Sequence, residues 1–143
     1  GFPAYTVLQP LYNLMERQGY EGALADVCSR HGVGVIPYFS LASGFLTGKY
    51  RSQADLGKSP RGAWIAKYLD ERGMRVLAAL DQVAEARNTE PGAVALAWLL
   101  TRPNISAPIA SATSAKQLQS LLDGVSLTLT AEEAERLTRA SAL

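Results

Sequence analysis

The sequence predicts an α/β fold in which short parallel strands alternate with helices. Residues 33–39, VGVIPYF, form an almost unbroken apolar run, which is typical of a strand buried on both faces of a parallel sheet. Other β-rich segments alternate with segments in which apolar residues recur every three or four positions. Parallel strands joined by helices imply right-handed crossovers, so we expect a parallel sheet with helices packed against it.

The first part of the chain is predicted to contain a strand, a helix and a second strand. Residues 4–13, AYTVLQPLYN, are rich in β-forming residues up to Pro10, which ends the strand because proline cannot donate a ladder hydrogen bond. The helix that follows ends at Gly32, a residue typical of a helix C-cap. One face of this helix is apolar and carries Leu24, Val27 and Cys28.

The rest of the chain is predicted to be mostly helical. Residues 43–67 show no clean period, so we expect a long polar loop, which in a compact domain is usually functional or disordered. Residues 105–111, ISAPIAS, predict a third strand, although Pro108 disfavours a full ladder. Helices are expected at residues 71–87, from about 89 to 100, 114–123, and from about 130 onward.

Local signals mark the ends of these helices. Thr89 is the expected N-cap of its helix, with Pro91 in the first turn. Gly124 is expected just past the end of the next helix, in which leucines point inward. Thr130 and Glu133 have the spacing of a capping box. The leucines concerned are Leu118, Leu121 and Leu122.

The composition is that of one globular domain. The chain has 143 residues, of which 48% are apolar and 19% charged, with a net charge of +1. This balance gives no indication of nucleic-acid or membrane binding, and no apolar run approaches the ~20 residues that span a bilayer. The single Cys28 and the single His31 exclude an intramolecular disulfide, a cysteine-based metal cluster and a histidine-rich metal site. A cytoplasmic location is the default expectation.

Polar side chains follow the end of each predicted strand, where ligands bind in α/β proteins. The segments are LQPLYN at 8–13, PYFSLASGFLTGKY at 37–50 and APIASATSAKQLQSLL at 107–122. In this order and spacing they resemble the C-terminal part of the aldo-keto reductases, NADP(H)-dependent oxidoreductases with a (β/α)₈ barrel. The resemblance implies barrel strands six to eight. The expected fold is therefore a partial (β/α)₈ TIM barrel with three βα units and a long cofactor loop.

The resemblance implies cofactor-binding roles at the first two strand ends. Gln9 matches the glutamine that hydrogen-bonds the nicotinamide carboxamide, and Tyr38 matches the aromatic residue that stacks on the nicotinamide ring. Phe39 and Ser40 stand where serine and proline are usual, so the detailed contacts there are expected to differ. The turn that wraps the pyrophosphate is matched by the backbone of Phe39, Ser40, Leu41, Ala42 and Gly44.

The long polar stretch carries the residues implied to bind phosphate. Thr47 and Lys49 match residues that reach the cofactor phosphates, with Arg61 as their expected companion. From Lys49 to Lys67 there are five cations against one acid, so this stretch is more positive than the whole chain. That excess independently favours an anionic ligand. A solvated loop with scattered charge is the alternative.

The last block is implied to hold the adenosine end of the cofactor. Thr113 and Gln117 match positions that contact the 2′-phosphate ribose and the adenosine, at the start of a helix whose free N–H groups favour an anion. Ser111 replaces the usual glycine of this block, and Ser120 with Leu121 replaces a Glu-Asn pair. These departures weaken the implied preference for NADP over NAD.

No residue of this chain is assigned as catalytic. The family delivers hydride to a carbonyl carbon with a tyrosine acid that works with aspartate, lysine and histidine on earlier strands, and no segment here matches those strands. His31 is interpreted as a helix-end residue and Cys28 as packing. Trp98 is expected in the core. Trp64 is expected to be an exposed loop residue, with contact to a cofactor or partner as the alternative.

The chain begins with GFPAYTVLQ, without an initiator methionine, and three strands are too few for a parallel sheet covered on both faces. We therefore expect residues 1–143 to be a single incomplete domain, the cofactor-binding portion of a reductase of aldehydes or ketones, inactive alone. Its open edges are expected to meet the missing N-terminal barrel half or another copy of the chain. A non-catalytic nucleotide-binding or structural fragment is the alternative, and another phosphate-binding barrel enzyme is less favoured.

Overall fold

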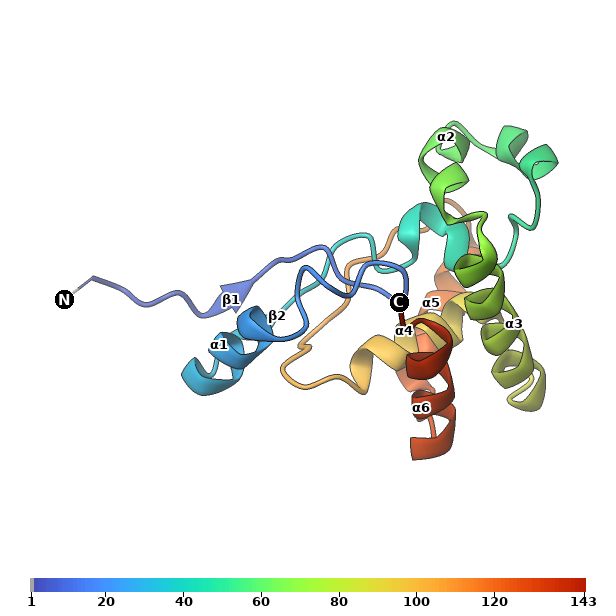
Figure 1. The fold of residues 1–143 in the computed structure, drawn as a ribbon. Coiled ribbons are helices and arrows are strands. Elements are labelled where there is room, and N and C mark those ends of the chain that lie inside the picture. Colours follow the sequence, from blue (N-terminus) through green and yellow to red (C-terminus); the bar gives the residue numbers. More distant parts are fainter. Residues whose placement is uncertain (1) are drawn as a thin grey trace.

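A two-stranded parallel sheet and six α-helices make up residues 2–143, the part of the chain that this computed structural model describes (Figure 1). The strands lie with α1 on one side of the molecule, and the longer helices α3 to α6 lie on the other. The elements are β1 (Val7–Leu8), α1 (Ala23–His31), β2 (Gly34–Val35), α2 (Gly62–Ile65), α3 (Glu71–Ala86), α4 (Pro91–Leu100), α5 (Ala115–Ser126) and α6 (Ala131–Ala140).

The strand, helix, strand order of the first part is confirmed, but the strands are shorter than predicted. In the sheet, Val7 lies beside Gly34 and Leu8 beside Val35. Parallel pairing continues beyond β2, because the Tyr38 N–H donates to the Pro10 carbonyl at 3.0 Å. Helix α1 ends at Gly32, as predicted. Prolines at both strand ends cannot donate ladder hydrogen bonds, which limits the length of the regular sheet.

The third predicted strand is wrong as a strand, although its chain segment runs where a strand was expected. The Ser106 N–H donates to the Val35 carbonyl at 2.8 Å, and the Ile109 N–H donates to the Pro37 carbonyl at 2.9 Å. These bonds lie on the edge of β2 opposite β1, but they form only an isolated bridge at Ile105. Pro108 interrupts the run because it has no N–H. The chain therefore forms two strands and one loosely paired segment rather than three complete βα units.

Helices α3 to α6 form the main core. Helix α4 packs between α3 and α5, and α6 packs against α3. Residues 92–99 of α4 are all buried, so this helix is apolar all round, as expected of a helix at the centre of a core. Trp98 is fully buried, as predicted, and its indole N–H donates to Thr138 on α6 at 3.0 Å.

The predicted ends of the last four helices are confirmed in part, with Pro91 in the first turn of α4 as expected. On α3, the apolar residues at helical spacing are buried: Val76, Leu77, Leu80, Val83 and Ala84. The capping box of Thr130 and Glu133 is present at the start of α6. The predicted N-cap of α4 is wrong by one residue, because Glu90 occupies that position and makes no side-chain cap. Gly124 lies inside α5 rather than past its end. It lies so close to α4 that a β-carbon there would come within 2.9 Å of the Ala93 carbonyl.

The long loop predicted at residues 43–67 is wrong in its local structure. Most of it forms short helical pieces: the 3₁₀ helices at Ala42–Thr47, Gln53–Lys58 and Ala66–Tyr68, together with α2. Phe45, Leu46 and Tyr50 are fully buried and fix this stretch to the core. The sequence did not reveal these anchors, because they are few within a polar stretch and do not recur with a helical period.

Apolar side chains remain exposed around the sheet and on α5. In the strand region, Tyr5 and Val7 are exposed, as are Leu24 and Val27 on the predicted apolar face of α1. On α5, the predicted inward positions of Leu118 and Leu122 are wrong, since both are about half exposed, and Leu121 is half-buried. None of the helices described here is long and apolar enough to cross a membrane.

Candidate cofactor-binding site

The turn that follows β2 contains an unusual concentration of left-handed backbone. The φ angles are 54° at Phe39, 49° at Ala42, 58° at Ser43 and 97° at Gly44. Residues with a β-carbon rarely adopt such angles, and an aromatic residue does so at a cost of about 1–3 kcal/mol. Elsewhere in residues 2–143, the non-glycine residues with positive φ are asparagines, which tolerate it. Strain of this kind is typical of ligand-binding turns.

A buried asparagine holds this turn in place. Asn13 is fully buried, and its side-chain amide donates to the Phe39 carbonyl at 2.9 Å. The Asn13 side-chain oxygen accepts from the N–H groups of Met15 and Glu16 at 2.8 and 3.0 Å. The Ala42 N–H also donates to the Phe39 carbonyl, at 2.7 Å. The surrounding structure therefore stabilises a backbone conformation that is unfavourable on its own.

Three residues predicted to bind the pyrophosphate or another phosphate group lie together here: Gly44, Thr47 and Lys49. The Thr47 hydroxyl donates to the Gly44 carbonyl at 2.7 Å. The Lys49 side chain folds back over Gly44, and a β-carbon at Gly44 would lie 3.7 Å from the Lys49 ammonium nitrogen. That ammonium also lies 5.0 Å from the centre of the Tyr50 ring. The Ser40 hydroxyl, by contrast, donates to the Pro37 carbonyl at 3.1 Å, so it stabilises the turn from within.

Ion pairing separates the five cations of this stretch into two groups. Arg51 makes a bidentate pair with Asp81, Lys58 pairs with Asp55, and Lys67 pairs with Glu16. Lys49 and Arg61 have no carboxylate partner among residues 2–143. These are the two cations that the resemblance assigns to phosphate. The charge excess of the stretch is therefore concentrated on the two predicted side chains.

The paired cations stabilise the surrounding structure. Hydrogen bonds from the Lys58 ammonium and the Arg51 N–H lower the pKa of Asp55. Burial acts to raise the pKa of Glu16, but hydrogen bonds from Lys67 and Tyr68 outweigh it, so that this pKa lies below its ordinary value. Both carboxylates therefore stay ionised at neutral pH, and each keeps its ion pair with a lysine.

Gln9 and Tyr38 lie at the carboxyl ends of the two neighbouring strands. Both are exposed, Tyr38 by 37% of its surface. Because the Tyr38 N–H donates to the Pro10 carbonyl, the residue next to Gln9 is tied directly to Tyr38. The structure thus brings the two predicted nicotinamide contacts to one edge of the sheet, where ligands bind in α/β folds.

Thr113 and Gln117 form a second cluster at the start of α5. The Gln117 side-chain oxygen accepts from the Thr113 N–H at 2.8 Å and from the Thr113 hydroxyl at 3.0 Å. Ser114 caps the helix by accepting from the Gln117 N–H at 3.2 Å. All three residues are exposed. Thr113 and Gln117 are therefore brought together, as predicted, but on an open surface.

The beginning of α4 lies between the two clusters. Gly92 lies against Thr47, and a β-carbon at Gly92 would come within 3.6 Å of the Thr47 methyl group. On the other side, Lys116 pairs with Glu90 at 3.3 Å. One end of a single buried helix thus contacts the turn after β2 and the start of α5. The two clusters are therefore linked through the same end of α4.

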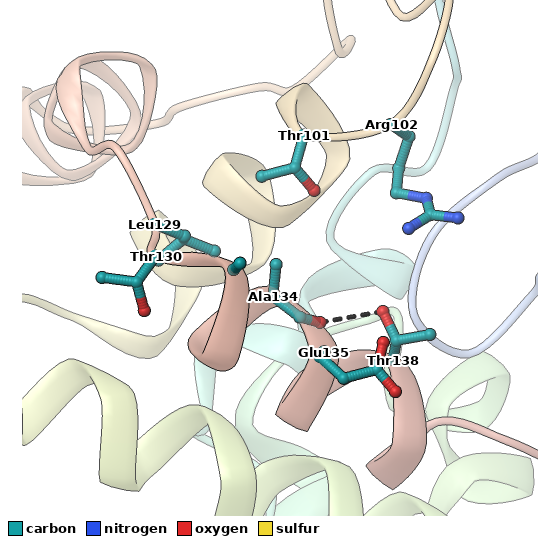
Figure 2. Close-up of a pocket in the computed structure, with 8 residues that line it drawn as sticks. Thr101, Arg102, Leu129, Thr130, Ala134, Glu135 and Thr138 are labelled. Atoms are coloured by element: carbon teal, nitrogen blue, oxygen red, sulfur yellow. Dashed lines mark hydrogen bonds between the residues drawn. The ribbon is translucent and has the colours of Figure 1, made fainter.

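Two hollows in the structure are lined by residues other than the predicted cofactor residues, and the second of them includes Glu90 and Lys116. One, of about 300 Å³, is bounded by the end of α4 and by α6, with Arg102 at one side and Thr130 at the other (Figure 2). Another, of about 380 Å³, lies between the start of α4 and α5 and includes Lys116. Neither contains a predicted cofactor residue. In residues 2–143 there is also no cluster of histidine, cysteine and carboxylate side chains suited to a metal ion.

Sequence reasoning missed two contributors to the site. Asn13 follows the first strand in PLYN, where an asparagine is a common turn residue, but nothing in the sequence indicated that it reaches Phe39. The contact between the rings of Phe39 and Trp64, 6.4 Å apart, joins residues far apart in the chain. The only indication of this contact in the sequence was the presence of Trp64 in an otherwise polar stretch.

Polar and aromatic side chains at the carboxyl ends of the parallel strands are typical of an α/β protein that binds a ligand there. Comparison with known proteins makes the assignment specific, because the sequence model of the aldo/keto reductase family matches residues 2–142. The chain belongs to the aldo/keto reductase family. The resemblance of the motifs to this family is thereby confirmed.

Curated relatives include both reductases and a protein named for a channel. The chain is 33% identical over 134 residues to L-glyceraldehyde 3-phosphate reductase of Escherichia coli O157:H7, covering 87% of this chain and 38% of that protein. It is 32% identical over 124 residues to the probable voltage-gated potassium channel subunit beta of Arabidopsis thaliana, covering 83% and 38%. It is 29% identical over 133 residues to an aldo-keto reductase of Alternaria alternata, covering 93% and 35%. The chain therefore spans well under half the length of these relatives.

Proposed function

We propose that this chain is the cofactor-binding portion of an NADP(H)-dependent aldo-keto reductase that reduces aldehydes or ketones. The observation that carries the proposal is the strained turn at the end of β2, over which the unpaired Lys49 folds. Successive N–H groups in left-handed and right-handed conformations make a concave surface that binds anions. A lysine without a carboxylate partner adds the charge that a phosphate group needs.

Each cluster is proposed to bind one part of the dinucleotide. Gln9 binds the nicotinamide carboxamide, and Tyr38 stacks on the ring so that hydride leaves from one face. The turn from Phe39 to Gly44 wraps the pyrophosphate, while Thr47, Lys49 and Arg61 bind phosphate groups. The adenosine end lies against Thr113 and Gln117 at the start of α5, where helix N–H groups favour an anion. The dinucleotide supplies the hydride, and the chain's residues orient it.

The carbonyl-protonating acid is proposed to come from residues outside this chain. The exposed apolar side chains around β1 and α1 support a covering surface, which the remaining barrel or a second copy of the chain would provide. The 143-residue chain is therefore expected to show no NADPH-dependent reduction of a reactive aromatic aldehyde. Turnover that copurifies with this chain would contradict that part of the proposal. A cytoplasmic location belongs to the same proposal.

Calorimetric titration of NADPH and NADH tests the cofactor assignment. Lys49→Ala is expected to weaken NADPH binding by about tenfold or more and NADH binding much less, because a charge-assisted contact to the 2′-phosphate is lost. Lys58→Ala is the matched control, since Lys58 is also exposed but is paired with Asp55. Equal weakening of both nucleotides by Lys49→Ala would show that Lys49 does not read the 2′-phosphate. Absence of NADPH binding by the unmodified protein would contradict the proposal itself.

A further inference from the structure

Three exposed aromatic side chains lie next to one another beside the strained turn. The rings of Tyr38 and Phe39 are 5.2 Å apart, and those of Phe39 and Trp64 are 6.4 Å apart in an edge-on arrangement. Their exposed fractions are 37%, 45% and 60% for Tyr38, Phe39 and Trp64. Large aromatic side chains gain stability from burial, so a contiguous exposed group of them indicates a surface that contacts something else.

The structure fixes these rings in position. Phe39 is held at a positive φ by the two hydrogen bonds to its carbonyl, from Asn13 and Ala42. Trp64 lies on α2, the short helix at the upper edge of Figure 1, which is anchored by the fully buried Ile65. Neither ring depends on a mobile tail for its placement. A pre-positioned aromatic surface costs little conformational entropy when it binds a ligand.

The charge around this surface suits a planar ligand that carries phosphate. Arg61, which has no carboxylate partner in residues 2–143, precedes Trp64 by one turn of chain, and the Trp64 N–H donates to the Arg61 carbonyl at 3.0 Å. The turn that ends with Lys49 begins at Phe39 itself. Aromatic rings combined with unpaired cations are the recognition elements for a nucleotide.

We propose that Phe39 and Trp64 extend the stacking surface of Tyr38 and determine the affinity of the nicotinamide mononucleotide half of the cofactor. This inference rests on the proposed function. Phe39 stands where the family usually has a serine, so a ring replaces a small hydroxyl at this point. Trp64 reaches the same surface from another segment. Phe39 is the first residue of the strained turn, and Asn13, which donates to the Phe39 carbonyl, is the positioning residue of Phe39.

Titration with two halves of the cofactor tests this inference. The probes are NADPH, reduced nicotinamide mononucleotide and 2′,5′-ADP. Trp64→Ala is expected to weaken NADPH and the nicotinamide mononucleotide by about tenfold, the effect of removing one stacked ring, and to leave 2′,5′-ADP within about twofold. Trp64→Phe keeps a ring and is expected to retain most of the affinity. Tyr5→Ala removes an exposed aromatic side chain outside the cluster and is the matched control.

Fluorescence provides a second readout that does not depend on affinity. Trp98 is fully buried, so acrylamide quenching of tryptophan emission in this chain reports mainly on the exposed Trp64. Saturating NADP⁺ is expected to protect the emission of the unmodified protein and to leave that of Trp64→Phe unchanged. Unchanged quenching in the unmodified protein would overturn the inference.

The outcomes separate this inference from the function on which it rests. If the protein binds NADPH and Lys49→Ala weakens it, while Trp64→Ala binds as tightly as the unmodified protein, the inference is overturned and the proposed function stands. If Trp64→Ala weakens 2′,5′-ADP as much as NADPH, the assignment to the nicotinamide half is overturned. If the unmodified protein binds no NADPH, both are overturned.

Discussion

The two segments proposed to bind the cofactor are built in different ways. Residues 37–49 form a turn with strained backbone, internal hydrogen bonds and a fully buried anchor, Phe45. Residues 105–117 run mostly exposed along the sheet edge, held to β2 by two hydrogen bonds before α5 begins. The first segment is fixed by buried contacts, including the hydrogen bond from Asn13, whereas the second lies exposed and is held by few contacts.

This difference indicates how each segment contributes to binding. A pre-formed turn holds its backbone and the Lys49 side chain in place, so little conformational entropy is lost at the moment of binding. An exposed segment contributes mainly through individual side chains, and it is free to adjust to the ligand. Changes in the turn should therefore alter the stability of the protein, and changes in the later segment should leave the stability nearly constant.

The largest effect is expected at the asparagines that anchor each segment. Asn13→Ala should lower the free energy of unfolding by about 2–3 kcal/mol, because it leaves buried N–H groups and the Phe39 carbonyl short of partners. Asn104 precedes the second segment, and its side chain donates only to the exposed Ser29 hydroxyl. Asn104→Gly, which preserves the positive φ there, should cost less than about 1 kcal/mol.

Urea unfolding followed by circular dichroism measures both variants. Equal losses of unfolding free energy would show that the two segments are anchored alike and would remove the contrast. Binding of NADPH should also weaken in Asn13→Ala, since the turn it supports would lose its fixed conformation.

A smaller effect on the unfolding free energy is expected from adding a β-carbon at a glycine of the first segment or removing the side chain of a serine in the second. Gly44→Ala should lower the unfolding free energy by about 1–2 kcal/mol, because φ is 97° there, a backbone conformation that residues with a β-carbon rarely adopt. Ser111→Gly restores the glycine usual in the family and should change the unfolding free energy by less than about 0.5 kcal/mol. Thermal unfolding of the pair distinguishes these cases. A destabilising Ser111→Gly would mean that the second segment is more constrained than its contacts indicate.

The sequence predicted the helices well and the connecting segments poorly, for a physical reason. Helix α3 and the cap of α6 depend on the spacing of residues close together in the sequence, and this spacing can be read from the sequence itself. The third strand failed because its pairing depends on a neighbouring edge that sequence spacing does not specify, and Pro108 reduces what it can donate. Short helices at 42–68 depend on single buried residues such as Phe45, which have no period to detect.

For the site, the sequence predicted which residues gather but not what supports them. The motif resemblance assigned Gly44 to the pyrophosphate turn, Thr47 and Lys49 to the cofactor phosphates, and Thr113 with Gln117 to the adenosine end. The structure brings Gly44, Thr47 and Lys49 together, and it brings Thr113 and Gln117 together. The support from Asn13 and the contact of Trp64 arise from long-range packing. Such contacts join residues whose separation along the chain carries no periodic signal.

Acid is expected to lower the unfolding free energy by protonating Glu16, which follows the turn anchor Asn13 closely in the chain. The pKa of Glu16 is lowered from 4.5, so its interactions stabilise the fold above about pH 4.5 and are lost as pH falls through the lower folded value. Glu16→Gln should remove part of the acid sensitivity, by less than about 1 kcal/mol, because the pair with Lys67 is partly exposed. Urea unfolding at about pH 7 and about pH 3 measures it. Glu71→Gln, at an exposed carboxylate with a long ion pair, is the control.

The smallest effect on stability is expected at Thr113. Thr113→Val removes the hydroxyl that donates to Gln117 at 3.0 Å but retains the backbone N–H that donates to the same oxygen at 2.8 Å. Because both residues are exposed, the unfolding free energy should change by less than about 0.5 kcal/mol. NADPH affinity should nevertheless fall by about threefold to tenfold, since the hydroxyl is proposed to contact the 2′-phosphate ribose. Calorimetry together with urea unfolding tests both halves of this expectation. A loss of more than about 1 kcal/mol of unfolding free energy would place Thr113 in a structural role. The contrast between the two segments in their contribution to stability would then be lost.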